Sequence, residues 1–315
     1  MSSWTSLLST SPPNARKPRV GQGTPLAELR ERYDLFAAAF GSAPNDTVAE
    51  RAQLGQLKGE WVRVEESAPE RVVLYLHGGG FISGSPESYR PLVARLCKAA
   101  GAKALSLDYR LAPEFPFPAC LRDAVDGYRF LIGKGISPRS IVVAGDGAGG
   151  GLAFAALIAI RNAQMPMPAA CMAMSPWADM SLSGWSMLEK GPTDSALSWD
   201  MLFVSARHYL KGANPGDPYA SPVFGNMRDF PPIMVHAGSN EILKDDAARL
   251  GELAADANIP VSVEVYDGMH HVFQGSPSAS EAKVSLNRFG HFIRTRTSAA
   301  DTPNQEFAKT AKAGR

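Results

Sequence analysis

The chain of 315 residues, with a mass of 33.7 kDa, has room for one large α/β domain or two smaller ones. Its 32 basic and 31 acidic residues leave a net charge of +1. This balance argues against a nucleic-acid partner held by phosphate neutralisation and against a polybasic membrane anchor. The hydrophobic content of 45% is typical of a globular protein with a full core, and the 29 glycines exceed the average share.

Cysteine usage and apolar runs narrow the class further. Cys97, Cys120 and Cys171 form no C-x-x-C pair, which excludes a disulfide scaffold and a zinc ribbon and predicts buried thiols in a reducing compartment. The longest unbroken apolar run, residues 152–160, is far below the roughly 20 residues of a membrane span. The N-terminus has no basic start before an apolar stretch, so we expect no secretory signal and a cytoplasmic location.

The first part of the chain predicts helices. Residues 1–20 are rich in Ser and Pro, and we expect them to be loosely ordered. Between residues 25 and 55, Leu26, Leu29, Tyr33, Phe36 and Phe40 recur at helical spacing.

A regular alternation of strands and helices begins at residue 61. The period-two run 61–66 predicts an edge strand. Further strands are predicted at 71–76, 102–109, 140–145, 170–175, 232–238 and 261–266, and helices at 86–100, 119–133, 151–163, 243–257 and 278–297.

Largely apolar strands that alternate with helices predict a parallel sheet covered on both faces, hence an α/β fold. Residues 177–230 interrupt the rhythm and are rich in Pro, Trp and Met. We therefore expect five segments: N-terminal cap helices (1–55), the first part of the core (56–176), a cap or lid insertion (177–230), the second part of the core (231–298) and a disordered tail (299–315).

The first chemical motif is His77-Gly78-Gly79-Gly80-Phe81, directly after the strand 71–76. Residues without side chains at a strand end let backbone N–H groups point into a cleft, where they stabilise an oxyanion. The alternative is an ordinary glycine-rich turn.

The second motif, residues 145–150, follows an apolar strand and opens an apolar helix. It has two functional interpretations. One is a nucleophile elbow of the G-x-S-x-G type, with Gly147 where the serine belongs. The other is the dinucleotide fingerprint G-x-G-x-x-G. The fingerprint needs an acidic residue about 20 positions on, at the end of the next strand, whereas no acid appears before Asp179.

Two segments near the C-terminus place an acid and then a histidine just past a strand end. They are residues 238–246 and 266–273. The order of nucleophile, acid and histidine matches that of α/β-hydrolases. The adjacent His270 and His271 also suggest a metal, but no third ligand stands at a suitable spacing, so no metal is expected.

Together, HGGGF, DYRLAPE (108–114), G-D-x-A-G-G, SPWAD (175–179) and the acid and HVF segments resemble the hormone-sensitive-lipase-like branch of the α/β-hydrolases. The resemblance runs from about residue 70 to 275 in the correct order. It implies an eight-stranded, mostly parallel sheet under a helical cap. It also implies hydrolysis of carboxylic esters with small to medium acyl chains, without a metal or organic cofactor.

The same resemblance assigns roles to individual residues. Alignment on Leu243 and Asp245 puts the acid at Glu241, and the histidine directly before Val272 is His271. The backbone N–H groups of Gly79, Gly80 and Ala148 would bind the oxyanion, Glu114 would brace the oxyanion loop, and His77 and Asp146 would support the site.

Position 147 departs from the family, which has serine there. Without a hydroxyl no acyl-enzyme forms, while glycine adopts the strained elbow freely. We therefore expect Gly147 to preserve the fold and remove the chemistry. One explanation is an inactivated esterase, which the intact surroundings favour. The alternative is a naturally non-catalytic small-molecule binding protein on a hydrolase scaffold.

A cluster of Met and Trp at residues 172–201 has two interpretations, core packing or an adaptable apolar pocket. The pocket hypothesis names Phe81, Trp177, Trp185 and Met187. It predicts a small apolar or aromatic ester as substrate, with amides and thioesters left open. The resemblance also suggests a homodimer paired through the sheet edge near residues 261–266.

Overall fold

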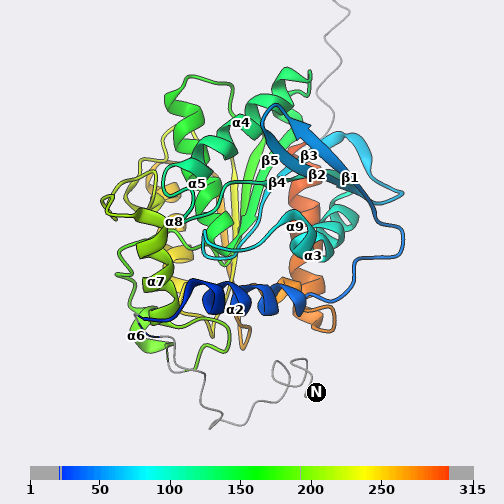
Figure 1. The fold of residues 1–315 in the computed structure, drawn as a ribbon. Coiled ribbons are helices and arrows are strands. Elements are labelled where there is room, and N and C mark those ends of the chain that lie inside the picture. Colours follow the sequence, from blue (N-terminus) through cyan, green and yellow to red (C-terminus); the bar gives the residue numbers. More distant parts are fainter. Residues whose placement is uncertain (1–20, 22, 192, 298–315) are drawn as a thin grey trace, which may run out of the picture.

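The computed structural model describes residue 21 and residues 23–297, apart from residue 192. The expected loose N-terminus (1–20) and disordered tail (299–315) lie outside the described residues. Within them, one eight-stranded sheet is flanked by helices on both faces (Figure 1). This arrangement confirms the predicted fold class.

The sheet has the order β1-β2-β4-β3-β5-β6-β7-β8. The pairs β1·β2 and β2·β4 are antiparallel and the remaining neighbours are parallel. The central strands β5 and β6 are buried along their whole length, as expected for parallel strands covered on both faces. The strands are β1 (Val48–Leu54), β2 (Leu57–Arg63), β3 (Ala68–Leu76), β4 (Ala102–Asp108), β5 (Ile141–Asp146), β6 (Ala170–Met174), β7 (Ile233–Gly238) and β8 (Val261–Tyr266).

The core consists of two hydrophobic clusters, and each contains a different set of helices. The helices α3 (Pro86–Ala100) and α9 (Ser280–Arg296) belong to one cluster. The other cluster contains α4 (Ala119–Gly133), α5 (Gly147–Asn162) and α8 (Lys244–Asp256). In Figure 1 these two sets lie on opposite sides of the sheet.

Three further helices lie together at one end of the sheet, at the bottom of Figure 1. They are α2 (Leu26–Ala38), α6 (Ser186–Glu189) and α7 (Trp199–Leu210). Both α6 and α7 fall in the segment 177–230 that interrupts the strand–helix rhythm. Short 3₁₀ turns occur at Pro138–Ser140, Pro222–Phe224 and Phe273–Gly275.

The sequence prediction was wrong about the sheet edge. The helix in the first segment ends at Ala38, and Val48–Leu54 form strand β1, so residues 1–55 do not consist of cap helices alone. The run at 61–66 is consequently not an edge strand, because β2 lies between β1 and β4. The strand was missed because its exposed residues include Glu50, Arg51 and Gln53, which interrupt any apolar run. The sequence feature that best indicates β1 is the two-residue turn at 55–56, which joins it to β2.

The cysteines and the helix lengths complete the description of the fold. All three cysteines are free thiols and buried, as predicted. No helix in the described part of the chain is long and apolar enough to cross a membrane.

Candidate active site

Strand β5 runs directly into helix α5 through a sharp turn at Gly147. Its φ of +49° lies in the left-handed region, which glycine adopts without strain. A Cβ atom at this residue would lie 3.3 Å from Nε2 of His271. The backbone N–H of Trp177 donates to the Gly147 carbonyl at 2.8 Å and fixes the turn. A side chain at position 147 would therefore face the imidazole.

Glu241 and His271 form a buried pair at the ends of neighbouring strands. Glu241 follows β7 and His271 follows β8, and the His271 Nδ1 to Glu241 Oε2 distance is 3.2 Å. Glu241 is fully buried and His271 is 5% exposed. The ring of His270 instead contacts the backbone carbonyl of His271. The structure thus pairs the two residues that the resemblance indicated.

Several influences act on the pKa of His271. Burial is the largest and lowers it. The hydrogen bond and charge of Glu241, with the charges of Asp194 and Asp146, outweigh burial and raise the pKa above its ordinary value. A carboxylate beside Nδ1 therefore favours the protonated ring, as a general base requires after it has taken a proton.

The glycine-rich loop after β3 lies beside the same turn. Both segments line one pocket of about 330 Å³, its open mouth included. The lining includes Gly79, Gly80, Gly147, Ala148 and His271. The first turn of α5 carries backbone N–H groups that the helix itself leaves unpaired, and its positive dipole end favours an anion. The predicted oxyanion residues are therefore brought together.

Buried polar groups hold the loop from the strand side. His77 Nδ1 lies 2.7 Å from the Gly78 carbonyl, and the Tyr109 hydroxyl donates to the His77 carbonyl at 2.7 Å. Asp146 Oδ1 accepts from the Gly78 N–H at 3.1 Å and from the Tyr75 hydroxyl at 2.7 Å. Burial lowers the pKa of His77 to about 4 and raises the pKa of Asp146 to about 7. His77 and Asp146 therefore contact the glycine-rich loop from the strand side.

Helix α2 holds the loop from the opposite side. Arg30 donates from Nε to the Ile82 carbonyl at 2.7 Å and from Nη2 to the Ala112 carbonyl at 3.1 Å. Its guanidinium also pairs with the half-exposed Glu114 at 2.6 Å. Glu114 therefore reaches the oxyanion loop through Arg30. Arg30 could not be predicted from the sequence, because no motif marks it.

Tyr33 on α2 was predicted only as a position at helical spacing. Its hydroxyl lies 3.1 Å from Ser205 Oγ of the cap. A Cβ at Gly80, whose φ is +63°, would lie 2.6 Å from that hydroxyl, so this contact needs glycine. Tyr33 thus packs the cap, α2 and the oxyanion loop against one another.

The predicted pocket wall is only partly correct. Trp177 lines the pocket, but Phe81 is buried against Tyr209, with ring centroids 3.9 Å apart, and Met187 is buried outside the lining. Trp185 is 70% exposed at the start of α6 and does not line the pocket. The remaining apolar and aromatic wall, which the sequence did not identify, consists of Tyr33, Phe36, Tyr89, Leu197, Leu202 and Leu243.

Among the described residues, no three His, Cys, Asp or Glu side chains gather as ligands for a metal ion. The pocket contains a histidine–carboxylate pair, backbone N–H groups and apolar walls. Such a set is suited to acyl transfer through an oxyanion.

Comparison with known proteins agrees with this geometry. Residues 73–275 match the α/β hydrolase fold family. An acetyl-hydrolase of Streptomyces hygroscopicus is 41% identical over 272 residues, covering 85% of this chain and 89% of the relative. An esterase of Acinetobacter venetianus is 34% identical over 267 residues, covering 83% and 87%.

Solved structures agree as well. A crystal structure of EstE5 soaked with ethyl alcohol matches with a TM-score of 0.86 at 36% identity, covering 90% of this chain and 95% of that one. An esterase from the bacterial hormone-sensitive lipase family gives 0.85 at 37% identity, covering 90% and 94%. These matches favour the elbow over the dinucleotide fingerprint at residues 145–150. The chain therefore belongs to the α/β hydrolase fold family, and its relatives there are esterases and acetyl-hydrolases.

Proposed function

We propose that the pocket is the site of a carboxylic ester hydrolase whose nucleophile position holds Gly147. The observation that carries the proposal is the 3.3 Å between a Cβ at position 147 and Nε2 of His271. A serine there would put its hydroxyl within reach of the ring, and Glu241 stands on the other side of that ring. The chain lacks this hydroxyl because residue 147 is glycine, so we expect essentially no acyl-enzyme chemistry.

With serine at position 147, each residue has a definite task. His271 would take the serine proton as the oxygen attacks the ester carbonyl, and Glu241 would stabilise the imidazolium. The N–H groups of Gly79, Gly80 and Ala148 would bind the oxyanion. His271 would then give its proton to the leaving alcohol. Water would repeat the two steps and release the acid.

The relatives support short acyl chains. One curated relative is named an acetyl-hydrolase, and crystals of one structural neighbour were soaked with p-nitrophenyl butyrate. The apolar side chains that line the pocket fit a small uncharged ester. We propose acetate and butyrate esters as the substrate range to be tested first.

The experiment is to compare the Gly147 chain with Gly147→Ser on p-nitrophenyl acetate and butyrate. We expect kcat to rise by a factor of about 1,000 or more, because a serine nucleophile typically contributes at least that much. Adding His271→Ala or Glu241→Gln to Gly147→Ser should remove most of the gain. A Gly147→Ser protein that is folded but no faster than the Gly147 chain would refute the assignment.

The alternative, a small-molecule binding protein, rests on the same pocket being complete apart from the nucleophile. Calorimetry with butyrate and with a stable butyrate ester tests it in the unchanged chain. Binding without any gain of activity from Gly147→Ser would favour the binding protein over the hydrolase.

A further inference from the structure

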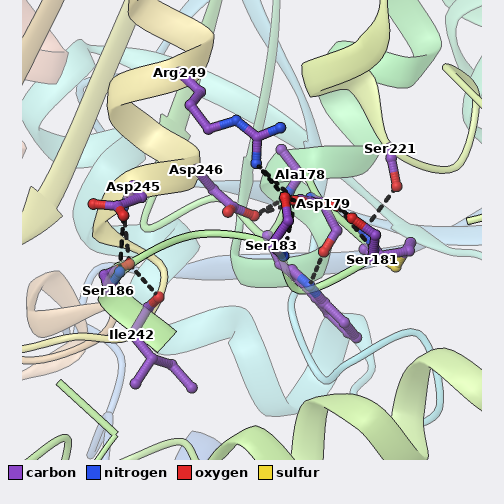
Figure 2. Close-up of polar contacts among 12 residues, drawn as sticks. Ala178, Asp179, Ser181, Ser183, Ser186, Ser221, Ile242, Asp245, Asp246 and Arg249 are labelled. Carbon is purple, nitrogen blue, oxygen red and sulfur yellow. Dashed lines mark hydrogen bonds and ion pairs between the residues drawn. The ribbon is translucent and has the colours of Figure 1, made fainter. Parts of the chain in front are cut away.

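The segment that leads to the candidate acid is held from the cap. Ile242, the residue directly after Glu241, donates its N–H to Asp194 Oδ2 at 2.9 Å. Its carbonyl accepts from Ser186 Oγ at 2.7 Å, as Figure 2 shows. Asp194 and Ser186 are fully buried. Both backbone polar groups of this residue are therefore fixed by side chains of the segment 186–197.

The start of α8 is bound to the same cap segment by further contacts (Figure 2). The Ser186 N–H donates to Asp245 Oδ2 at 2.8 Å. Asp246 Oδ2 accepts from the N–H groups of Ala178 and Asp179 at 2.7 and 2.9 Å. The cap between 178 and 197 and the segment 241–246 thus form one hydrogen-bonded unit.

Asp194 connects this unit to the pocket wall. Its Oδ1 accepts from the N–H groups of Ala196 and Leu197 at 2.7 and 2.9 Å. Leu197 lines the pocket. In the described chain, Glu241 Oε1 is buried and accepts no hydrogen bond. The direction of the Glu241 carboxylate therefore depends on His271 and on a backbone that Asp194 holds.

Three carboxyl groups from three elements influence the ring of His271. Glu241 comes from the segment after β7, Asp194 from the cap and Asp146 from the end of β5. On the α2 side the ring meets Phe36, which carries no charge, with centroids 5.8 Å apart. Asp194 is therefore one of three acidic groups placed to stabilise the imidazolium.

We propose that Asp194 is a positioning residue of the active site. It fixes the Glu241 segment through Ile242 and adds a negative charge that stabilises protonated His271. This inference rests on the proposed function for its effect on catalysis, whereas its effect on His271 is measurable in the Gly147 chain without any activity.

The first test is an NMR titration of the His271 ring in the Gly147 chain, with the signal assigned by its loss in His271→Gln. In Asp194→Asn the pKa of His271 should fall by about half a unit or more, because a negative charge that favoured the proton has gone. Ser186→Ala removes a contact to Ile242 without removing charge and should leave that pKa in place. Asp200→Asn on the exposed face of α7 is the matched control for charge.

The second test uses the same substitutions in the Gly147→Ser protein. We expect Asp194→Asn and Ser186→Ala to lower kcat about ten-fold with little change in KM, because both loosen Glu241. Only Asp194→Asn should shift the acid limb of the pH–rate profile to lower pH. A folded Asp194→Asn protein with unchanged His271 titration and kcat would overturn the proposal.

The esterase assignment and the role of Asp194 can be refuted separately. An inactive Gly147→Ser protein whose His271 still responds to Asp194→Asn would refute the esterase assignment and leave the electrostatic role of Asp194 supported. If Asp194→Asn does not fold, Asp194→Glu provides the test, because it keeps the charge and displaces the carboxylate. It should then preserve the His271 pKa and lower kcat, and the reverse pattern would contradict the inference.

Discussion

Asp146 holds the loop beside the turn at Gly147, but its buried carboxyl lowers the stability of the folded chain when it ionises. Its carboxyl is nearly fully buried at the end of β5 and accepts hydrogen bonds from Tyr75 and Gly78. Burial, the largest influence, raises its pKa to about 7, against the ordinary 3.8, although these hydrogen bonds and the charge of His271 act in the opposite direction. The group thus shapes the oxyanion loop but resists ionisation.

This pKa predicts how Asp146→Asn changes stability with pH. Between pH 4 and 7 the folded chain keeps a proton that the unfolded chain loses, so the free energy of unfolding falls as pH rises. Asparagine keeps an acceptor and cannot ionise. From pH 5 to pH 8 the stability of Asp146→Asn relative to the parent should therefore improve by about 2 kcal/mol.

Urea unfolding of both proteins at the two pH values measures this change. Asp246, whose pKa burial raises to about 8, is common to both proteins and cancels in the difference. Asp200→Asn, an exposed substitution, should show no such dependence. A difference between Asp146→Asn and its parent that is equal at both pH values would contradict the prediction.

Among the elements, those with strong local signals were predicted best. The helices Pro86–Ala100 and Ala119–Gly133 have the predicted bounds, and so has the strand Val261–Tyr266. In the first of these helices, a Ser85 cap with Pro86 next to it marks the start, and Gly101 ends it. Helix α5, by contrast, begins at Gly147, four residues before the predicted start, because the elbow leads directly into the helix.

The role of α2 could not be predicted in this way. The helix was expected from its apolar spacing, but its contact with the oxyanion loop joins Arg30 to Ile82, 52 residues further on. A charged side chain on a helix is most often solvated, and nothing local distinguishes Arg30 from its neighbours. Long-range pairing of this kind depends on the assembled fold.

We expect Arg30→Ala to lower the activity of the Gly147→Ser protein. The substitution removes the donors to the Ile82 and Ala112 carbonyls, so the oxyanion loop loses its fixed geometry. The loss in kcat should be roughly ten-fold, since a misplaced oxyanion donor weakens transition-state binding more than substrate binding. Steady-state kinetics with p-nitrophenyl butyrate measures kcat and KM separately. Glu31→Ala, exposed on the same helix, is the control, and equal kcat values in the two variants would argue against a role for Arg30.

At the scale of the whole molecule, the positions of the motifs in the chain predicted that the candidate site residues would lie close together. The glycine loop after β3, the elbow after β5, Glu241 after β7 and His271 after β8 all follow parallel strands. Carboxyl ends of parallel strands lie at one edge of the sheet, so these residues converge there. Their meeting is predictable from the sequence because the sheet topology, rather than side-chain detail, brings them together.

The pocket wall was harder to predict, because segments far apart in the sequence build it. It combines α2, α3, the segment before α7, α7 itself and the start of α8. Trp185 and Leu202 both stand in the cap and both are apolar, yet one is 70% exposed and the other 1%. Composition shows that the cap is rich in large apolar residues, whereas tertiary packing decides which of them face the pocket.

The choice of acyl chain should therefore depend on Leu202 and not on Trp185. In the Gly147→Ser protein, Leu202→Ala removes bulk from the wall and should favour longer esters. A buried methylene contributes about 0.8 kcal/mol, so the ratio of kcat/KM for p-nitrophenyl hexanoate to that for acetate should rise about four-fold or more. Trp185→Ala removes a larger side chain from the surface and should leave the ratio unchanged. If Trp185→Ala moves the ratio while Leu202→Ala does not, α7 does not form the acyl-binding wall.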